Sequence, residues 1–134
     1  MDTNVNEINR VSSNSIFKGD LYSQNDIRID GIIFGTVCSE GKVVVGEKAF
    51  IKGDIVASYI DIWGNVEGTL YSGDTLSLKA TAKVAGDLNF SRLQIEIGAD
   101  FVGACKKLSA DEYATQLNRC RLADPRLTQI AENE

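Results

Sequence analysis

The sequence predicts an all-β fold, namely a single-stranded β-helix (a solenoid) of about six short rungs. Three observations predict it: a glycine recurs about every seventeen residues, apolar side chains occupy fixed positions around it, and apolar and polar residues alternate between successive glycines. A chain of 134 residues is long enough for one domain with its own core. One repeat alone could not bury its apolar face, whereas stacked repeats share a single core.

The repeat is defined by glycines separated by 16, 18, 15, 18 and 17 residues. Apolar residues stand two positions before and two positions after each glycine, so we expect these side chains to point into one continuous core. The glycines are Gly19, Gly35, Gly53, Gly68, Gly86 and Gly103. The preceding residues are Phe17, Ile33, Ile51, Val66, Val84 and Phe101, and the following residues are Leu21, Val37, Ile55, Leu70, Leu88 and Cys105.

Further along each repeat, two apolar residues flank a single intervening residue. This spacing is typical of strands, in which alternate side chains point to opposite faces. Turn-forming pairs such as Asp30-Gly31 and Ser72-Gly73 separate these strands from the next repeat. The apolar pairs are Ile27 and Ile29, Val43 and Val45, Ile60 and Ile62, Leu76 and Leu78, and Leu93 and Ile95.

The repeats span residues 16–108, and segments of different character flank them. Residues 1–15 are polar and rich in Asn and Ser, so we expect a disordered N-terminal tail. Residues 109–134 are expected to form a C-terminal tail that contains a short helix or is disordered. Ser109 and Glu112 have the spacing of a capping box, and Tyr113, Leu117 and Cys120 follow at helical spacing. The sequence leaves open whether this helix caps the last rung.

The composition argues against several classes of function. The net charge of −5 disfavours a nucleic-acid partner, because phosphate binding requires a basic surface. The chain contains no histidine, the commonest general base and transition-metal ligand. Its three widely spaced cysteines are expected to be reduced thiols rather than a disulfide framework or a zinc site. We therefore expect no enzyme activity, no catalytic residue, no cofactor and no metal.

Aspartates follow alternate repeat glycines, at Asp20, Asp54 and Asp87. Two carboxylates at a suitable separation could serve a glycosidase. A regular column of aspartates at turns is better explained by the hydrogen-bonding role of Asp in turns. A hexapeptide-repeat acyltransferase, another solenoid class, is disfavoured because its six-residue spacing fails and such enzymes use a histidine.

Residues 29–31, 34–37, 42–49, 51–55 and 95–105 carry a distinctive set of motifs. These segments resemble the bactofilin family, and the resemblance extends across residues 16–108. The resemblance implies a right-handed β-helix and a bacterial cytoskeletal scaffold that assembles without nucleotide into non-polar filaments. It also implies a cytoplasmic protein that organises cell-shape or cell-wall machinery.

Members of this family often associate with membranes through a short N-terminal segment. The start of this chain, Met1-Asp2-Thr3-Asn4, is acidic and polar, which argues against direct membrane binding. No apolar run is long enough to span a bilayer, and no secretory signal opens the chain. A location at the inner face of the cytoplasmic membrane stays open.

The terminal rungs are as apolar as the interior ones, which predicts that the chain polymerises with itself. Stacking a second subunit on a terminal rung would pair the open strand edge and bury its side chains. The alternative is that the tails cap both ends, leaving a monomeric or dimeric adaptor for a protein partner. The expected interface comprises Ile16, Phe17, Leu21, Ile27 and Ile29 at one end and Leu93, Ile95, Ile97 and Phe101 at the other.

A second surface is expected on the outside of the first rungs. Strand alternation that places Ile33 and Ile51 inside places Ile32 and Phe50 outside, with Phe34 nearby. An exposed apolar patch of this kind predicts lateral bundling or a contact with a partner. The N-terminal tail could equally cover it.

Overall fold

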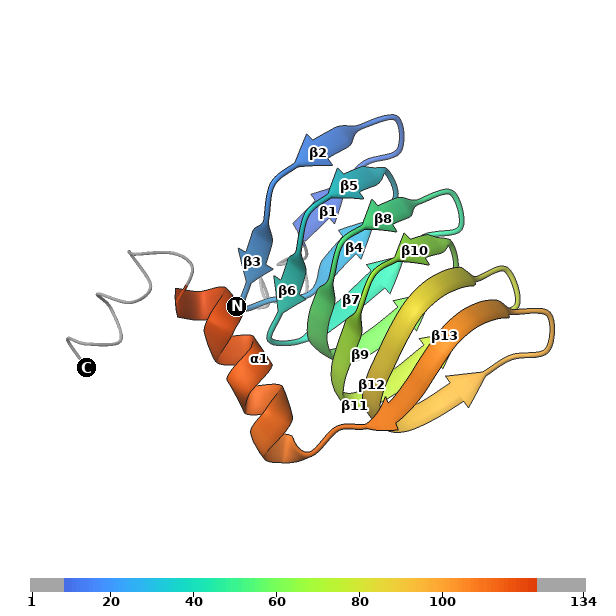
Figure 1. Cartoon of the computed structure of the whole chain (residues 1–134). Coiled ribbons are helices and arrows are strands. Elements are labelled where there is room, and N and C mark those ends of the chain that lie inside the picture. The colour runs from blue at the N-terminus through green and yellow to red at the C-terminus, as the bar shows by residue number, and fades with distance from the viewer. Residues whose placement is uncertain (1–8, 123–134) are drawn as a thin grey trace, which may run out of the picture.

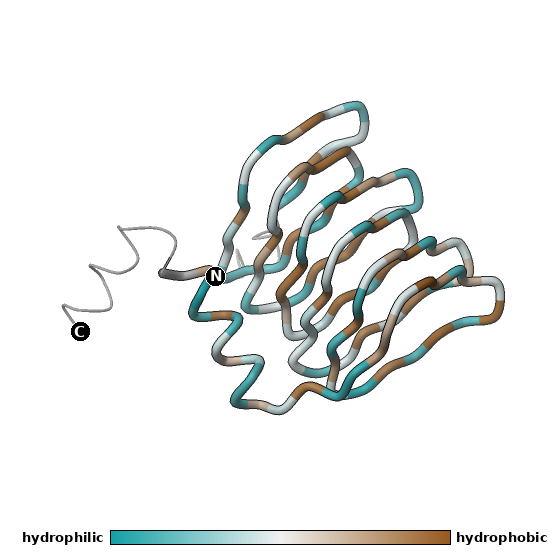
Figure 2. The backbone as a smooth tube through the Cα atoms, in the orientation of Figure 1, coloured by the Kyte–Doolittle hydropathy of each residue, from teal (hydrophilic) through white to brown (hydrophobic). Residues whose placement is uncertain are grey.

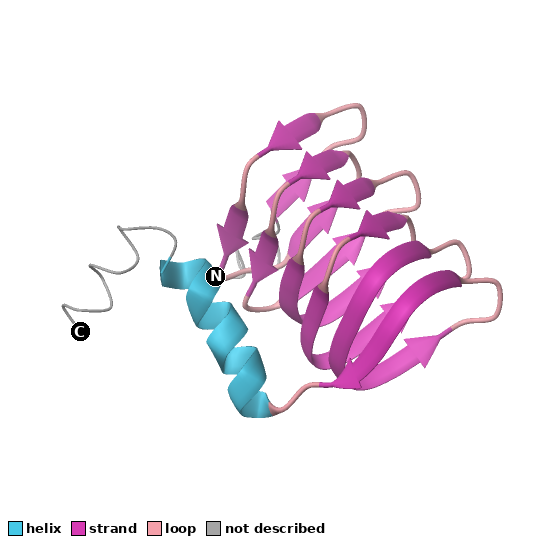
Figure 3. Ribbon diagram, in the orientation of Figure 1, coloured by secondary structure: helices cyan, strands magenta, loops and turns pink. Residues whose placement is uncertain are grey.

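The structure, a computed structural model, describes residues 9–122 of the chain. In this part of the protein, parallel strands wind into a β-solenoid of six rungs with three faces, and one helix, α1 (Ala110–Leu122), lies along its side (Figures 1 and 3). The predicted fold class is confirmed. Long strands run around corners from one face to the next towards the C-terminal end of the solenoid.

Each face is a ladder of parallel strands in register. Face 1 contains β2 (Ile16–Lys18), β5 (Ile32–Phe34), β8 (Phe50–Lys52), β10 (Asn65–Glu67) and the first residues of β12 (Lys83–Ile95) and β13 (Asp100–Lys107). Face 2 contains β3 (Leu21–Ser23), β6 (Val37–Ser39), the starts of β9 (Ile55–Ile62) and β11 (Leu70–Leu78), and the later parts of β12 and β13. Face 3 contains β1 (Asn9–Val11), β4 (Ile27–Ile29), β7 (Lys42–Val45) and the ends of β9, β11 and β12.

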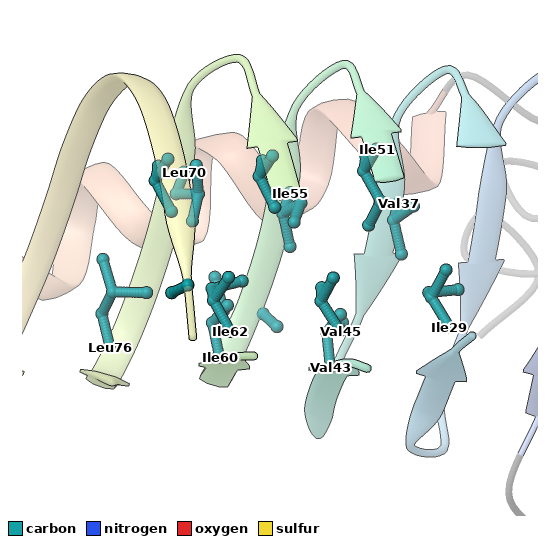
Figure 4. Close-up of a cluster of buried hydrophobic side chains, with 14 of the residues drawn as sticks. Ile29, Val37, Val43, Val45, Ile51, Ile55, Ile60, Ile62, Leu70 and Leu76 are labelled. Carbon is teal, nitrogen blue, oxygen red and sulfur yellow. The ribbon is translucent and has the colours of Figure 1, made fainter. Parts of the chain in front are cut away.

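The inward positions form the core that the repeat predicts. On face 1, Ile33, Ile51, Val66 and Val84 lie in one column of paired residues, and all four are buried. Faces 2 and 3 contribute equivalent columns, whose side chains meet in the middle of the coil (Figure 4). Apolar segments therefore recur at the same place from rung to rung (Figure 2). Burial of each Ile, Leu or Val contributes about 1.5–3 kcal/mol to folding.

The repeated glycine marks the corner between faces 1 and 2. There the backbone has a positive φ, for example 155° at Gly68, a conformation that side-chain-bearing residues rarely adopt. A Cβ atom on Gly68 would lie 1.9 Å from the carbonyl oxygen of Gly53, in the rung below. Adjacent rungs approach so closely at this corner that no side chain fits. This close approach explains why the repeat has glycine at the corner.

Polar side chains at the corners bond to neighbouring rungs. Asp20 Oδ1 accepts the N–H of Thr36 at 2.9 Å, and Asp54 Oδ1 accepts that of Thr69 at 3.0 Å. This geometry agrees with a role in turns. Between faces 2 and 3, the hydroxyl of Ser72 donates to the carbonyl oxygen of Ser58 at 3.0 Å. Among the described residues, every buried side-chain nitrogen and oxygen has a hydrogen-bond partner.

The N-terminal boundary of the solenoid differs from the expectation. Residues 1–8 lie outside the described residues, but Asn9–Val11 form β1 instead of a disordered tail. β1 pairs in parallel with β4, with Val11 opposite Ile29. The open edge of β4 provides backbone partners, and Val11 packs against the core, so a segment with one inward apolar residue is enough to form a strand.

Helix α1 begins at the predicted capping box. The N–H of Ser109 donates to Glu112 Oε1 at 2.9 Å, and the N–H of Glu112 donates to Ser109 Oγ at 3.1 Å. The helix does not cap the last rung. It runs back along face 2 and contacts β9 and β11 (Figure 1). Residues 123–134 of the expected C-terminal tail lie outside the described part of the chain.

Candidate assembly interface

At the N-terminal end of the solenoid, each face presents a strand that pairs on one side only. These strands are β1, β2 and β3, whose described partners are β4, β5 and β6. Their inward residues are Val11, Phe17 and Leu21. All three side chains are half-buried and pack against the core. The end is therefore an apolar surface framed by unpaired backbone groups.

The C-terminal end has the same character. β13 closes faces 1 and 2, and the end of β12 closes face 3. Phe101 and Leu93 are half-buried against the core, while Ile95 is 44% exposed. Ile97, in the turn that follows, is 99% exposed. Exposed large aliphatic side chains next to an open strand edge are what a stacking surface requires.

The structure brings together seven of the nine expected end residues at or beside the two ends, and places two elsewhere. Ile27 and Ile29 are fully buried, because β1 covers the edge of β4 and shifts both side chains one rung inwards. They are therefore not end residues, and Val11 takes their place. The signal that could have identified β1 is the recurrence of Arg10-Val11 as Arg28-Ile29, eighteen residues later.

Ile16 lies in the first rung but points outwards. It is 63% exposed and stands in the same column as Ile32 and Phe50. Nearby, Phe34 is 41% exposed and forms a T-shaped pair with Phe50, with ring centroids 6.4 Å apart. The expected outer patch of Ile32, Phe34 and Phe50 thus forms a contiguous surface on face 1, extended by Ile16.

Sequence reasoning also missed Cys105 as an end residue, although it occupies an inward column. It pairs with Leu88 in the last rung and is exposed. Cys38 of β6 and Cys120 of α1, by contrast, contact each other where the helix packs on face 2. Cys38 donates a hydrogen bond to the Cys120 sulfur, and with burial this raises the pKa of the Cys38 thiol. The same hydrogen bond lowers the pKa of Cys120.

One ionic cluster holds the N-terminal end together. Arg10 and Arg28 are opposite each other in β1 and β4, so their like charges would repel. The carboxylate of Asp30 accepts hydrogen bonds from Arg28 at 3.0 and 3.1 Å and from Arg10 at 3.3 Å. The bond from Arg28 is the main cause of a lowered pKa for Asp30. Asp30 therefore stabilises the pairing of the terminal strand.

Within residues 9–122, no helix has the length and apolar character needed to cross a membrane. The same residues contain no group of three or more acidic or cysteine side chains placed to bind a metal ion. The arrangement offers two apolar, open-edged ends and one apolar outer patch. Apolar surfaces with open strand edges are typical of contacts between proteins.

Comparison with known proteins agrees with this geometry. The profile of a family described as "Bactofilin: Polymer-forming cytoskeletal" matches residues 9–106. Bactofilin BacO of Myxococcus xanthus is 27% identical over 93 residues, which cover 69% of this chain and 74% of that protein. A solved structure titled as a cryo-EM reconstruction of Thermus thermophilus bactofilin double helical filaments matches with a TM-score of 0.66 and 29% identity. It covers 75% of this chain and 99% of the solved one. The chain belongs to the bactofilin family of polymer-forming cytoskeletal proteins.

Proposed function

We propose that this protein is a non-enzymatic cytoskeletal scaffold whose subunits stack end to end, without nucleotide, into non-polar filaments. The observation that carries the proposal is that both solenoid ends combine half-buried core side chains with strand edges that have no partner among the described residues. Stacking would satisfy the backbone groups and remove apolar surface from water in one step.

The position of α1 supports assembly over a capped monomer. A capping helix would lie across the last rung, whereas α1 lies along face 2 and contacts β9 and β11. Phe101, Leu93 and Ile97 are thus left accessible by the described residues. The family and the filament reported for the Thermus thermophilus relative support self-association of the same kind.

The backbone at the repeated glycines supports assembly without nucleotide. Glycine-rich loops bind phosphate through free N–H groups. Here the N–H of Gly35 donates to the carbonyl of Lys52 at 3.1 Å, and that of Gly53 donates to Glu67 at 2.9 Å. These groups are used within the solenoid ladder and are not free to hold a phosphate.

We further propose that the filaments act in the cytoplasm, at or near the inner face of the membrane, and organise cell-shape or cell-wall machinery. This rests on the family alone. The surfaces that would recruit such partners lie on the sides of the rod, since the ends are occupied by self-contacts in a filament.

The test is negative-stain electron microscopy of the purified protein, without added nucleotide, beside Phe101→Arg and Gln94→Arg. Phe101 points inwards in the last rung, so Phe101→Arg buries an unpaired charge at the interface and costs about 3–5 kcal/mol. That raises the protein concentration needed for assembly by about a hundredfold or more. Gln94 is exposed on the outside of the same rung, so Gln94→Arg adds the same charge without touching the interface.

Filaments in the wild type and in Gln94→Arg, but not in a folded Phe101→Arg, would support stacking through this end. Single 14.6 kDa particles in all three proteins would favour the capped adaptor. Unchanged filaments in Phe101→Arg would exclude Phe101 from the interface.

A further inference from the structure

Helix α1 lies across face 2 as a bar that is joined to the last rung. β13 ends at Lys107 and α1 begins at Ala110, so a short link ties the helix to rung six. From there the helix passes over β11 and β9, in rungs four and three, and its far part reaches β6 in rung two (Figure 1). One helix therefore connects parts of the solenoid that are four rungs apart.

Two contacts fix the position of the helix. Near its start, the ring of Tyr113 rests where Gly73 has no side chain, and the Tyr113 hydroxyl lies 3.3 Å from that of Ser58. Two turns later, the thiol of Cys120 contacts that of Cys38. Seven residues of helix rise about 10 Å, which is the height of about two rungs. The spacing of the two contacts along the helix thus agrees with the spacing of the strands beneath it.

The surface beneath the helix is buried although it belongs to the outside of the solenoid. Cys38 and Val56 each stand between two inward residues of their strands, so strand alternation points them away from the core. Even so, Cys38 is 1% exposed and Val56 is 3% exposed. We attribute this burial to α1, which packs on the same face and covers this strip.

The helix is held on face 2 by few contacts. Within residues 110–120 no residue of the helix is fully buried. The half-buried ones form a single stripe at helical spacing, namely Tyr113, Gln116, Leu117 and Cys120. The ion pair between Lys106 and Glu112 is exposed and 3.9 Å long, so it adds little. A helix of 13 residues is marginal by itself in water, so one further bond at its far end should change its stability strongly.

We propose that Cys38 and Cys120 form a reversible disulfide that locks α1 onto face 2, so that the helix becomes a redox-controlled brace between rung six and rung two. Cys120 is half-buried and open to a small oxidant, whereas Cys38 is buried. Both are free thiols that already contact each other where the helix meets the sheet. Cys105, the remaining thiol of the chain, is exposed in the last rung and takes no part.

The oxidant is a small-molecule disulfide of the glutathione class. The Cys120 thiolate attacks one of its sulfurs, which forms a mixed disulfide and releases one small thiol. Cys38 then loses its proton to solvent and attacks the Cys120 sulfur, which releases the second small thiol. Two electrons and two protons thus pass from the two cysteines to the oxidant. The contact favours this order, because the hydrogen bond from Cys38 lowers the pKa of Cys120.

The disulfide should stabilise the whole solenoid as well as the helix. Repeats of a solenoid are stabilised by their neighbours, so an end rung that separates loosens the next one. A bond between residues 38 and 120 encloses rungs three to six in one covalent loop, and closing a long loop restricts the unfolded chain most strongly. This inference goes beyond the proposed function and does not depend on it, because it concerns a single subunit and α1 leaves the solenoid ends uncovered.

The test uses the full chain with Cys105→Ser, which removes the exposed thiol and any link between subunits through it. Equilibration with oxidised and reduced glutathione at graded ratios should give a Cys38–Cys120 disulfide within one chain, which excess reduced glutathione opens again. In the disulfide form, we expect hydrogen exchange of the α1 amides to slow by about tenfold or more. The urea midpoint of unfolding should rise, and both changes should disappear on reduction.

The matched control combines Cys105→Ser with Cys120→Ser. It keeps Cys38 and the contacts of Tyr113, so its hydrogen exchange and urea midpoint should be the same with and without the oxidant. If no disulfide forms at any glutathione ratio, the proposal is overturned. A disulfide that leaves the exchange of α1 and the urea midpoint unchanged would refute the brace, and one that excess reduced glutathione cannot open would refute the switch.

Discussion

At the scale of single residues, the corner glycines have the least freedom to change. Sequence spacing predicts their positions, because apolar neighbours recur at fixed offsets from them. It does not explain why these residues must be glycines, because the constraint is a carbonyl oxygen of another rung that lies where a Cβ atom would be. At Gly68 that oxygen belongs to Gly53, fifteen residues earlier in the chain.

Gly68→Ala should therefore destabilise the solenoid strongly. The added Cβ meets the Gly53 oxygen at 1.9 Å and the φ of 155° is unfavourable, so we expect a loss of about 3 kcal/mol or more. Gly98→Ala is the control: φ is 104°, but the nearest atom, the Ala80 oxygen, is 3.3 Å away. Its cost should be the backbone strain of about 1–2 kcal/mol. Equal losses in urea unfolding would show that close approach between rungs is not the constraint.

Asp30 gives the terminal strand a pH dependence with a definite sign. Its pKa is lowered from 3.8 in the folded protein, chiefly by the hydrogen bond from Arg28. A lowered folded-state pKa stabilises the fold above pH 3.8, and this contribution disappears as the pH falls through the folded-state value. Asp30→Asn should cost up to about 1 kcal/mol at pH 7, and the difference from the wild type should vanish in strong acid. A difference in unfolding free energy that stays the same from pH 7 into strong acid would contradict this role.

At the scale of elements, the sequence predicts the strands of rungs two to six well and the two flanking elements only in part. Strand β1 has one inward apolar residue, Val11, so no alternation marks it, and its stability comes from the edge of β4. Helix α1 was identifiable from its capping box. The position of the helix against the solenoid was not identifiable from the sequence. It depends on small residues such as Gly73, where an added Cβ atom would lie 2.7 Å from the Tyr113 ring.

The contact between Cys38 and Cys120 allows the docking of α1 to be tested. A small-molecule disulfide, such as oxidised glutathione, should react first at Cys120, whose pKa is lowered and whose thiolate forms more readily. Cys38 then displaces the bound thiol, so a Cys38–Cys120 disulfide forms and two small-molecule thiols are released. The reaction should accelerate as the pH rises through the pKa of Cys120.

Peptide mapping by mass spectrometry would detect the link, and circular dichroism should show the solenoid unchanged. Cys120→Ser serves as the control and should leave Cys38 unmodified in the folded protein, since Cys38 is buried beneath α1. Mixed disulfides on both residues without a link between them would show that α1 does not rest against β6.

At the scale of the whole molecule, the solenoid separates its surfaces by task. The two ends carry half-buried core side chains, face 1 carries an apolar outer patch, and face 2 is partly covered by α1. The apolar composition of the terminal rungs was readable in the sequence. The identity of the outermost residues was not, because it depends on whether β1 pairs with β4 and so displaces Ile27 and Ile29 from the end.

The position of Cys105 in the last rung allows the pairing of ends in the filament to be tested. In a non-polar filament, C-terminal ends face each other, so Cys105 of one subunit lies across the interface from Cys105 of the next. A rung of about seventeen residues folded into three faces has sides of at most about 20 Å, and Cys105 lies near the middle of one side. Two such thiols related by a two-fold axis through the centre of the rung are at most about 12 Å apart in the plane of the rung, so a flexible bis-maleimide about 15 Å long can join them. In a head-to-tail filament the two Cys105 residues are about 29 Å apart, the height of six rungs, and lie beyond its reach.

Cross-linking of assembled Cys120→Ser, in which Cys105 is the exposed thiol, should therefore give dimers of twice 14.6 kDa and no larger species. One thiol at one end can join only two subunits, so the product stops at the dimer. Cys105→Ser and Phe101→Arg should give none, because the first lacks the thiol and the second lacks the interface. Monomers alone from wild-type-like filaments would instead indicate head-to-tail stacking, with Phe101 packed near Phe17 of the next subunit as Val84 packs near Phe101 within the chain.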